Sequence, residues 1–237
     1  MTTLLAAAKD PAQFTTIHGI SFSDTTILDA AFTHRSYLNE RGHENISHNE
    51  RLEFLGDAVL ELLVTEFLFG RFPDEPEGIL TAYRAAMVNT DSLSYAAERL
   101  EMDHYLRMSK GERMDTEKGR GHILANTFEA FVGALFLDSG ITIAKAFVEK
   151  ELFPYIDTIL AEGLHRDAKS YFQERAQEIQ KTTPHYDLIS EVGPDHDKQF
   201  VMGLYLGDSL VCEGSGPSKQ KAETDAARKG LAIKGWN

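Results

Sequence analysis

The sequence predicts two domains of different class: an all-α domain over residues 1–162 and a small α+β domain over residues 168–237, joined by a linker at 163–167. Three observations predict this division. Apolar residues recur at helical spacing almost throughout the first 160 residues. Beyond them, strand-like alternation lies between two helical segments. The change falls at a short charged stretch that contains Gly163, as is typical of a domain boundary.

The first domain is expected to consist of helices without strands, because no apolar alternation of any length interrupts the helical pattern. Pro73 and Pro76 end the longest acidic helix, and the polar, glycine-containing residues 107–121 favour a loop. The helices are expected at residues 24–34, 50–70, 77–87, 90–100, 122–138 and 142–159.

The second domain is expected to have the order α-β-β-β-α. Gly193-Pro194-Asp195 and Gly207-Asp208 are turn signals that separate its strands. The helices are expected at residues 168–180 and 219–233, and the strands at 186–192, 200–206 and 209–213. On the last helix, the spacing of Ala222, Ala226, Ala227 and Leu231 predicts the face that packs on the sheet.

The composition is that of a soluble globular protein, and it favours a reducing, cytoplasmic setting. Cys212 is the only cysteine, which excludes an intramolecular disulfide and a zinc-binding thiol cluster. The apolar run Leu4–Ala8 has no basic flank and is too short for a signal peptide or a membrane span. We therefore expect no membrane partner.

The formal net charge of −13 argues at first against a nucleic-acid partner, but the charge is unevenly distributed. Residues 1–160 hold 14 Lys+Arg and 25 Asp+Glu, a net of −11, whereas residues 161–237 hold 10 and 12, a net of −2. Phosphate binding requires local positive charge, and residues 218–229 supply it through Lys219, Lys221, Arg228 and Lys229. A nucleic-acid partner for the second domain is therefore compatible with the acidic total.

Residues 49–60, Asn-Glu-Arg-Leu-Glu-Phe-Leu-Gly-Asp-Ala-Val-Leu, place carboxylates among strong hydrophobes. On a helix, Glu50, Glu53, Asp57 and Glu61 fall within an arc of roughly 80°. Leu52, Leu55, Val59, Leu62 and Leu63 are expected on the opposite side. So dense an acidic stripe repels itself unless a cation lies against it, and Mg²⁺ prefers carboxylate oxygens. The alternative is the solvated face of an amphipathic helix.

A second acidic position lies on the strongly apolar helix expected at 122–138, where Asn126 and Glu129 are spaced i, i+3. A buried carboxylate without a partner is costly, so Glu129 should face a cation or a strong donor. The alternative is an ordinary surface or capped glutamate. A metal ion shared with the first acidic helix would satisfy both groups.

Asn49–Leu60, together with Thr33–Tyr37 and Ile123–Gly140, resembles the signature segments of the ribonuclease III family, and the α-β-β-β-α segment resembles a double-stranded RNA-binding domain. The resemblance covers nearly the whole chain. It implies an endonuclease domain over 1–162 and an RNA-binding domain over 168–237. It further implies Mg²⁺-dependent hydrolysis of double-stranded RNA, with Mn²⁺ as a possible substitute, to 5′-phosphate and 3′-hydroxyl ends in rRNA processing and mRNA turnover.

The resemblance also implies roles for individual residues of the first domain. Phe54 matches the position of a plug that inserts into a pocket of a second subunit. A homodimer would supply one acidic cluster for each strand of a duplex. The alternative for Phe54 is an ordinary core position. The residues that match metal ligands are Glu53, Asp57, Asn126 and Glu129, and those that match acidic catalytic positions are Asp57, Glu129, Glu50 and Glu77.

In the second domain, the resemblance assigns RNA contacts to both helices and to one loop. Proteins recognise A-form RNA through its minor groove and its phosphates. For each residue that matches an RNA contact, the alternative is an ordinary polar residue in contact with solvent. Gln220 replaces a residue that is often basic in the family. The residues that match minor-groove contacts are Ser170, Gln173, Glu174 and His196, and those that match phosphate contacts are Ser218, Lys219 and Lys221.

Asn126 departs from the family pattern, which usually has Asp at this position. An amide oxygen still ligates Mg²⁺ but carries no charge, so weaker metal binding is expected. We expect a natural, active variant rather than an inactivating substitution, because three carboxylates remain. The competing hypothesis is a catalytically impaired double-stranded RNA-binding or assembly protein of the same fold. A DNA nuclease is disfavoured because the second domain suits A-form geometry.

Overall fold

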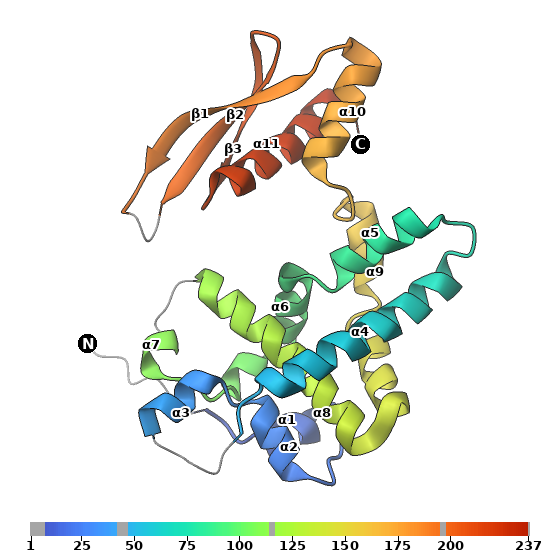
Figure 1. Ribbon diagram of the computed structural model, residues 1–237, viewed down its shortest axis with the longest axis vertical. Helices are drawn as coiled ribbons and strands as arrows, with labels where there is room; N and C mark the ends of the chain where they lie inside the picture. The colour runs from blue at the N-terminus through green and yellow to red at the C-terminus, as the bar shows by residue number, and fades with distance from the viewer. Residues whose placement is uncertain (1–7, 42–46, 114–116, 195–197, 237) are drawn as a thin grey trace. The chain divides into compact units, whose positions relative to one another are not determined.

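The computed structural model describes residues 8–41, 47–113, 117–194 and 198–236 (Figure 1). The chain divides into two compact units, Met1–Ala161 and Glu162–Asn237. The division falls next to the charged stretch that contains Gly163. Each unit has its own core.

The first unit is helical, as the sequence predicts. Its one β-type pairing among the described residues is an isolated bridge between Thr33 and Arg107. The helices are α1 (Pro11–His18), α2 (Thr25–Ala31), α3 (Arg35–Arg41), α4 (Glu50–Arg71), α5 (Glu77–Met87), α6 (Thr90–Arg99), the 3₁₀ turn η1 (Met102–His104), α7 (Lys110–Arg113), α8 (Glu117–Glu151) and α9 (Tyr155–Ala161).

Helices α4 and α8 form the centre of this unit and cross in direct backbone contact (Figure 1). Two glycines permit the contact. A Cβ atom at Gly56 of α4 would lie 1.8 Å from the carbonyl oxygen of Glu129, and one at Gly133 of α8 would lie 2.3 Å from that of Leu52. Only residues without a side chain allow so close an approach. The crossing therefore sets the spacing of every side chain beside it.

Helix α8 contains a long apolar stretch. By length and composition alone, Gly119–Glu151 would be long enough to cross a membrane, with a mean hydropathy of 1.6 over an 18-residue window. The central helix of a globular core has the same composition. Phe128, Phe131 and Leu135 are fully buried inside the first unit, so we interpret α8 as its core helix.

The helix boundaries differ from the sequence prediction in two places. The break predicted between the helices at 122–138 and 142–159 is present, since α8 kinks at the non-helical Gly140 (φ 80°), but the second helix ends early: α8 stops at Glu151 and α9 starts at Tyr155. The predicted loop at 107–121 is wrong in part, since it contains α7 and the first turn of α8. Ser109 starts α7 by accepting a hydrogen bond from the Glu112 N–H at 3.2 Å.

Two short helices and one exposed leucine were also not anticipated. Helix α1 begins where the Asp10 carboxylate accepts from the Ala12 N–H and ends at the left-handed Gly19. Helix α3 is too short for a clear apolar period. Leu62, expected on the buried side of α4, is 61% exposed. The buried face of α4 consists of Leu52, Gly56, Val59, Leu60, Leu63, Val64 and Leu68.

The second unit is an α+β module, as the sequence predicts, and its sheet is antiparallel with the order β1-β2-β3. Leu204 of the central strand pairs with Tyr186 on one side and Cys212 on the other. Both helices pack on one face of the sheet (Figure 1). The elements are α10 (Ala168–Gln180), β1 (Pro184–Val192), β2 (Gln199–Leu206), β3 (Ser209–Gly216) and α11 (Lys219–Lys234).

The core of the second unit lies between the sheet and the two helices. Phe172 of α10 contacts Trp236 in a tilted ring pair with centroids 5.1 Å apart. The predicted packing face of α11 is confirmed: Ala222, Ala226, Ala227 and Leu231 are buried. Gly214 of β3 brings the strand onto the helix, since a Cβ atom there would lie 2.1 Å from the Ala226 nitrogen.

Candidate active site and RNA-binding surface

The crossing of α4 and α8 brings the two predicted acidic groups together. Glu53 and Asp57 are one turn apart on α4, on either side of Gly56 in sequence. Asn126 and Glu129 are spaced i, i+3 on α8, and the Glu129 backbone is the group that Gly56 touches. The Asn126 amide lies near enough to Glu53 to lower the pKa of that carboxyl, so side chains of the two helices also meet here. The sequence prediction of one shared cluster therefore corresponds to one place in the fold.

The electrostatics of this cluster are those of carboxylates crowded in a half-buried position. Burial, together with the charges of Asp57 and Glu53, raises the pKa of Glu129 to about 8. Burial and the charges of Glu50 and Asp57 also raise the pKa of Glu53, although the Asn126 amide opposes this shift. A cation would offset the mutual repulsion at both positions.

The donor atoms fit a hard divalent cation, because all of them are carboxylate or amide oxygens. The positions of these donor atoms, however, do not yet form a complete ligand set. Among the described residues, no three Asp, Glu, His or Cys side chains converge closely enough to hold a metal ion as they stand. Like charges favour separation of the carboxylates, and Asn126 contributes no charge. The cluster therefore matches Mg²⁺ in chemistry, but its side chains would need to rotate on their helices to close around an ion.

Glu50 and Glu77, the other predicted acidic positions, lie at different places. Glu50 begins α4, where it is exposed and forms ion pairs with Arg35 at 3.3 Å and His48 at 3.8 Å. Glu77 begins α5, accepts a hydrogen bond from Thr81 at 3.1 Å, and lines a cavity of about 410 Å³ with Thr65 near the far end of α4. Within one chain, the structure thus places Glu50 on the same helix as the cluster but Glu77 away from the crossing.

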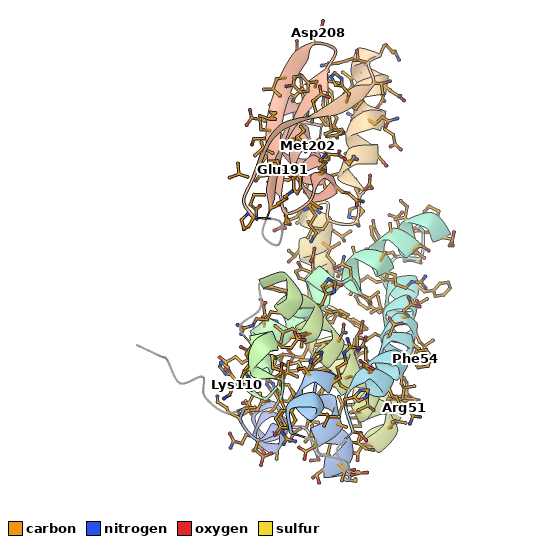
Figure 2. All side chains as sticks on the ribbon, turned by 60° about the vertical axis from the view of Figure 1, so that its left-hand side comes forward. Arg51, Phe54, Lys110, Glu191, Met202 and Asp208 are labelled. Carbon is orange, nitrogen blue, oxygen red and sulfur yellow. The ribbon has the colours of Figure 1, made fainter. Side chains whose placement is uncertain are left out.

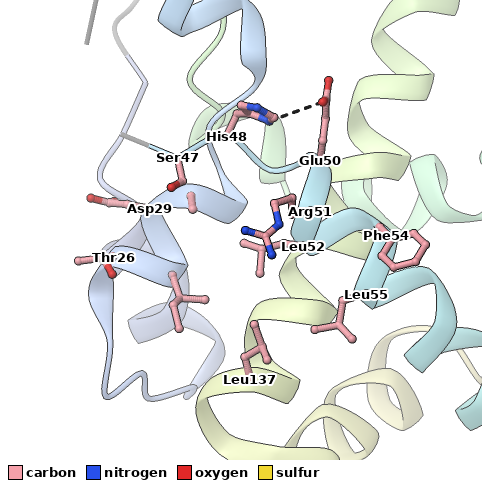
Figure 3. Close-up of a pocket in the computed structure, with 12 residues that line it drawn as sticks. Thr26, Asp29, Ser47, His48, Glu50, Arg51, Leu52, Phe54, Leu55 and Leu137 are labelled. Atoms are coloured by element: carbon pink, nitrogen blue, oxygen red, sulfur yellow. Dashed lines mark ion pairs between the residues drawn. The ribbon is translucent and has the colours of Figure 1, made fainter. Parts of the chain in front are cut away.

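Phe54 does not belong to the core of its own chain, since it is 83% exposed and projects from α4 (Figure 2). A cavity of about 1040 Å³ lies beside it (Figure 3). Three elements form its walls: Ile27 comes from α2, Leu52 and Leu55 from α4, and Leu137 from α8. The remaining lining is polar and includes Asp29, His48 and Arg51. An exposed aromatic ring next to a cavity with an apolar centre and a polar rim is typical of a protein interface.

Several supporting residues were not identified from the sequence. Asp138 follows Leu137 and accepts hydrogen bonds from the Ser23 N–H at 2.9 Å and the Asp24 N–H at 2.8 Å, which tie the start of α2 to the part of α8 just before its kink. It therefore joins two walls of the large cavity. In the sequence, Asp138 stands out only as an acidic residue directly after a long apolar run. Gly56 and Gly133 were visible as glycines inside helical patterns, which often mark close backbone contact.

The predicted RNA contacts of α10 are available to a ligand. Ser170, Gln173 and Glu174 are all exposed. The helix begins at Asp167, whose carboxylate accepts from the Ser170 N–H at 2.7 Å. His196 lies outside the described residues.

The predicted phosphate contacts gather at the start of α11. Ser218 caps the helix by accepting from the Lys221 N–H at 3.2 Å. Lys219 and Lys221 are exposed and form no ion pair within the described residues. Two ammonium groups and the free N–H groups of the first turn make this helix end favourable for anions.

Comparison with known proteins agrees with this architecture. The family model described as "Ribonuclease-III-like" matches residues 24–156, and that described as "Double-stranded RNA binding motif" matches residues 168–234. A curated relative from Enterococcus faecalis, named "Ribonuclease 3", is 45% identical over 90% of this chain and 93% of its own length. One from Latilactobacillus sakei with the same name is 43% identical over the same shares.

A solved structure supports the same family for the first unit. The nuclease domain of ribonuclease III from Campylobacter jejuni is 37% identical and superposes with a TM-score of 0.53, covering 60% of this chain and 97% of that one. Its description mentions structural flexibility in a region involved in dimer formation. The fold and the site thus define a helical nuclease domain followed by a double-stranded RNA-binding domain. The chain belongs to the ribonuclease III family.

Proposed function

We propose that this protein is a Mg²⁺-dependent endoribonuclease of the cytoplasm that hydrolyses double-stranded RNA as a homodimer, leaving 5′-phosphate and 3′-hydroxyl ends. The observation that carries the proposal is the glycine-mediated crossing of α4 and α8, which gathers Glu53, Asp57, Asn126 and Glu129. The double-stranded RNA-binding motif in the same chain supports the choice of substrate. Processing of ribosomal RNA and turnover of messenger RNA are the proposed cellular roles.

Each residue of the crossing has a separate task in this proposal. Glu53, Asp57 and Glu129 would hold Mg²⁺ with their carboxylates, and Asn126 would contribute its amide oxygen. The ion supplies charge relief for the scissile phosphate and activation of a water molecule. The Asn126 amide would keep Glu53 close to α8, and partial burial of Glu129 would strengthen its attraction to a cation. The backbone contact at Gly56 fixes the distance between the metal-binding residues of α4 and those of α8.

Glu50 and Glu77 remain predicted catalytic positions. Glu50 is held at the start of α4 by Arg35, which keeps its carboxylate near the RNA-facing end of the cluster in our proposal. Glu77 is away from the crossing within one chain, so its role would depend on the second subunit.

The homodimer is supported by Phe54 and the cavity beside it. In a two-fold dimer the same surface of each copy meets its equivalent, so a ring that projects near a cavity can enter the cavity of the other copy. An aromatic ring buries a large apolar area, which makes it an effective interface anchor. A dimer also places two acidic clusters on one duplex, so that both strands can be cut in a single encounter.

The alternative of a catalytically impaired RNA-binding protein is motivated by Asn126 alone. The relatives named "Ribonuclease 3" over nine tenths of this chain do not favour it.

The proposal is tested by incubating the full chain with a long RNA duplex and Mg²⁺. We expect short duplex products with the stated ends, no cleavage of a DNA duplex of the same sequence, and loss of cleavage with Glu129→Gln. Absence of cleavage by the unaltered chain, even at raised Mg²⁺ or with Mn²⁺, would contradict the proposal.

A further inference from the structure

Asp225 is an acidic side chain on α11, the helix whose start carries Ser218, Lys219 and Lys221. A negative charge on a helix that meets phosphates should weaken RNA binding by electrostatics alone. The contacts of Asp225 indicate a different role. Its Oδ2 atom accepts hydrogen bonds from the Ser215 N–H at 2.8 Å and from the Lys229 ammonium at 2.7 Å.

The bond to Ser215 attaches the end of β3 to the middle of α11. On either side of Ser215, glycines bring the strand onto the helix backbone: a Cβ atom at Gly214 would lie 2.1 Å from the Ala226 nitrogen, and one at Gly216 would lie 2.7 Å from the Ala222 nitrogen. Pairing with β2 holds this strand end in the sheet, but the two glycines have no side chains with which to attach it to the helix. The charge-assisted hydrogen bond from Asp225 supplies that attachment.

Lys229 completes this arrangement rather than serving as a free cation. Its ammonium bonds to Asp225 and lies 3.4 Å from the Glu213 carbonyl oxygen. Burial raises the pKa of Asp225, but the hydrogen bonds from Lys229 and Ser215 and the charges of Lys229 and Arg228 outweigh it and lower the pKa below its usual value. The carboxylate is therefore ionised at neutral pH.

Residues 215–218 lead directly from this attachment point to the cap of α11. We infer that Asp225 is a positioning residue for RNA binding, which holds the β3–α11 connection so that the first turn of α11 presents its lysines and free N–H groups to phosphates. The inference rests on the RNA binding proposed above for this domain. Hydrogen bonds tolerate only a few tenths of an ångström in length, so a small displacement of this turn loses phosphate contacts.

The test measures binding of the full chain to an RNA duplex of about 20 base pairs, long enough for one such domain. EDTA prevents cleavage, and the salt dependence of the dissociation constant reports the number of phosphate contacts. We expect Asp225→Ala to weaken binding by roughly five- to tenfold and to lower the slope of log Kd against log salt by about one. Asp225→Asn should retain most of the affinity, because its amide oxygen still accepts the Ser215 N–H.

Two matched variants separate position from charge. Asp208→Asn removes the same charge from the exposed turn between β2 and β3 (Figure 2) and should leave affinity unchanged or slightly tighter. Lys229→Met removes one positive charge but leaves the Asp225–Ser215 bond in place, so its loss of affinity should be clearly smaller than that of Asp225→Ala. Thermal unfolding of each variant establishes that it is folded at the assay temperature.

Tighter or unchanged binding by Asp225→Ala would overturn the inference in favour of simple charge repulsion. A loss with Lys229→Met as large as that with Asp225→Ala would overturn it in favour of a direct phosphate contact by the lysine. If Asp225→Ala does not fold, Asp225→Ser decides, because its shorter hydroxyl does not reach the Ser215 N–H: binding as tight as that of the unaltered chain contradicts positioning. If the unaltered chain does not bind the duplex, the proposed function fails instead.

Discussion

Glu129 should make the metal affinity of the site depend on pH. Its pKa of about 8 means that this carboxyl is mostly protonated at pH 7, so a cation must displace its proton. We predict that Mg²⁺ affinity, measured by isothermal titration calorimetry, rises with pH by up to tenfold per unit below about pH 8 and then levels. In Glu129→Gln this dependence should largely disappear. A pH-independent affinity of the unaltered chain would contradict the assignment.

The same shift has a consequence for stability. The folded-state pKa of Glu129 lies above its value in the unfolded chain, so its contribution is fully present below about pH 4.5 and is lost as pH rises through about 8. Chemical denaturation without metal should therefore show the unaltered chain losing stability, relative to Glu129→Gln, between these limits. A constant difference between the two proteins across this range would argue against the shift.

Asn126 is the residue at which the candidate site departs from its family. We predict that Asn126→Asp lowers the Mg²⁺ concentration for half-maximal cleavage by about tenfold, because one more charged ligand strengthens a hard-cation site. The measurement is the initial rate of duplex cleavage against Mg²⁺ concentration. Activity that appears only in Asn126→Asp would instead favour the RNA-binding alternative.

For single residues, the sequence predicts which side chains belong to the candidate site better than it predicts how those side chains are placed. The carboxylates of the cluster stand out because acids are rare among so many hydrophobes. Helical spacing also indicates that Phe54 lies off the apolar face. Rotamers are not encoded in spacing, so the incomplete convergence of the ligands was not foreseen. The distance of Glu77 from the crossing depends on how α5 packs, which no local pattern reveals.

At the scale of elements, the α4–α8 crossing depends on glycine. We predict that Gly56→Ala destabilises the protein by about 3 kcal/mol, because the new methyl group would overlap the Glu129 carbonyl oxygen and force the helices apart. Gly70→Ala is the control on the same helix, where a Cβ atom would meet nothing within 4 Å. It should be neutral or stabilising by up to about 1 kcal/mol. Equal effects of both changes in urea denaturation would contradict the role of the crossing.

The long amphipathic helices and the strands were predictable because each buries one face at a regular period. Shorter elements were not, since α1, α3 and α7 span too few residues for a period to emerge. Their starts depend on single caps such as Asp10 and Ser109. The kink at Gly140, by contrast, falls in the gap predicted between the helices at 122–138 and 142–159.

At the scale of the whole molecule, Phe54 is the proposed anchor of the dimer. We predict that Phe54→Ala raises the dimer dissociation constant by about 30-fold, corresponding to roughly 2 kcal/mol for loss of a buried aromatic anchor. Sedimentation velocity over a concentration series measures this change. Ile17→Ala, which truncates a side chain that is 69% exposed on α1, should leave association unchanged. A dimer unaffected by Phe54→Ala would require a different interface.

At Gly56 and Gly133 the contact of α4 with α8 runs through main chain, with no side chain in between. Ordinary core substitutions alter how side chains fill space, and evolution can exchange them freely so long as volume is conserved. Such exchanges therefore do not change the distance between the Glu53–Asp57 pair on α4 and the Asn126–Glu129 pair on α8. Leucines and phenylalanines elsewhere in the first unit can therefore diverge widely between relatives, and thermal tolerance can be engineered there, while the reactive centre keeps its dimensions.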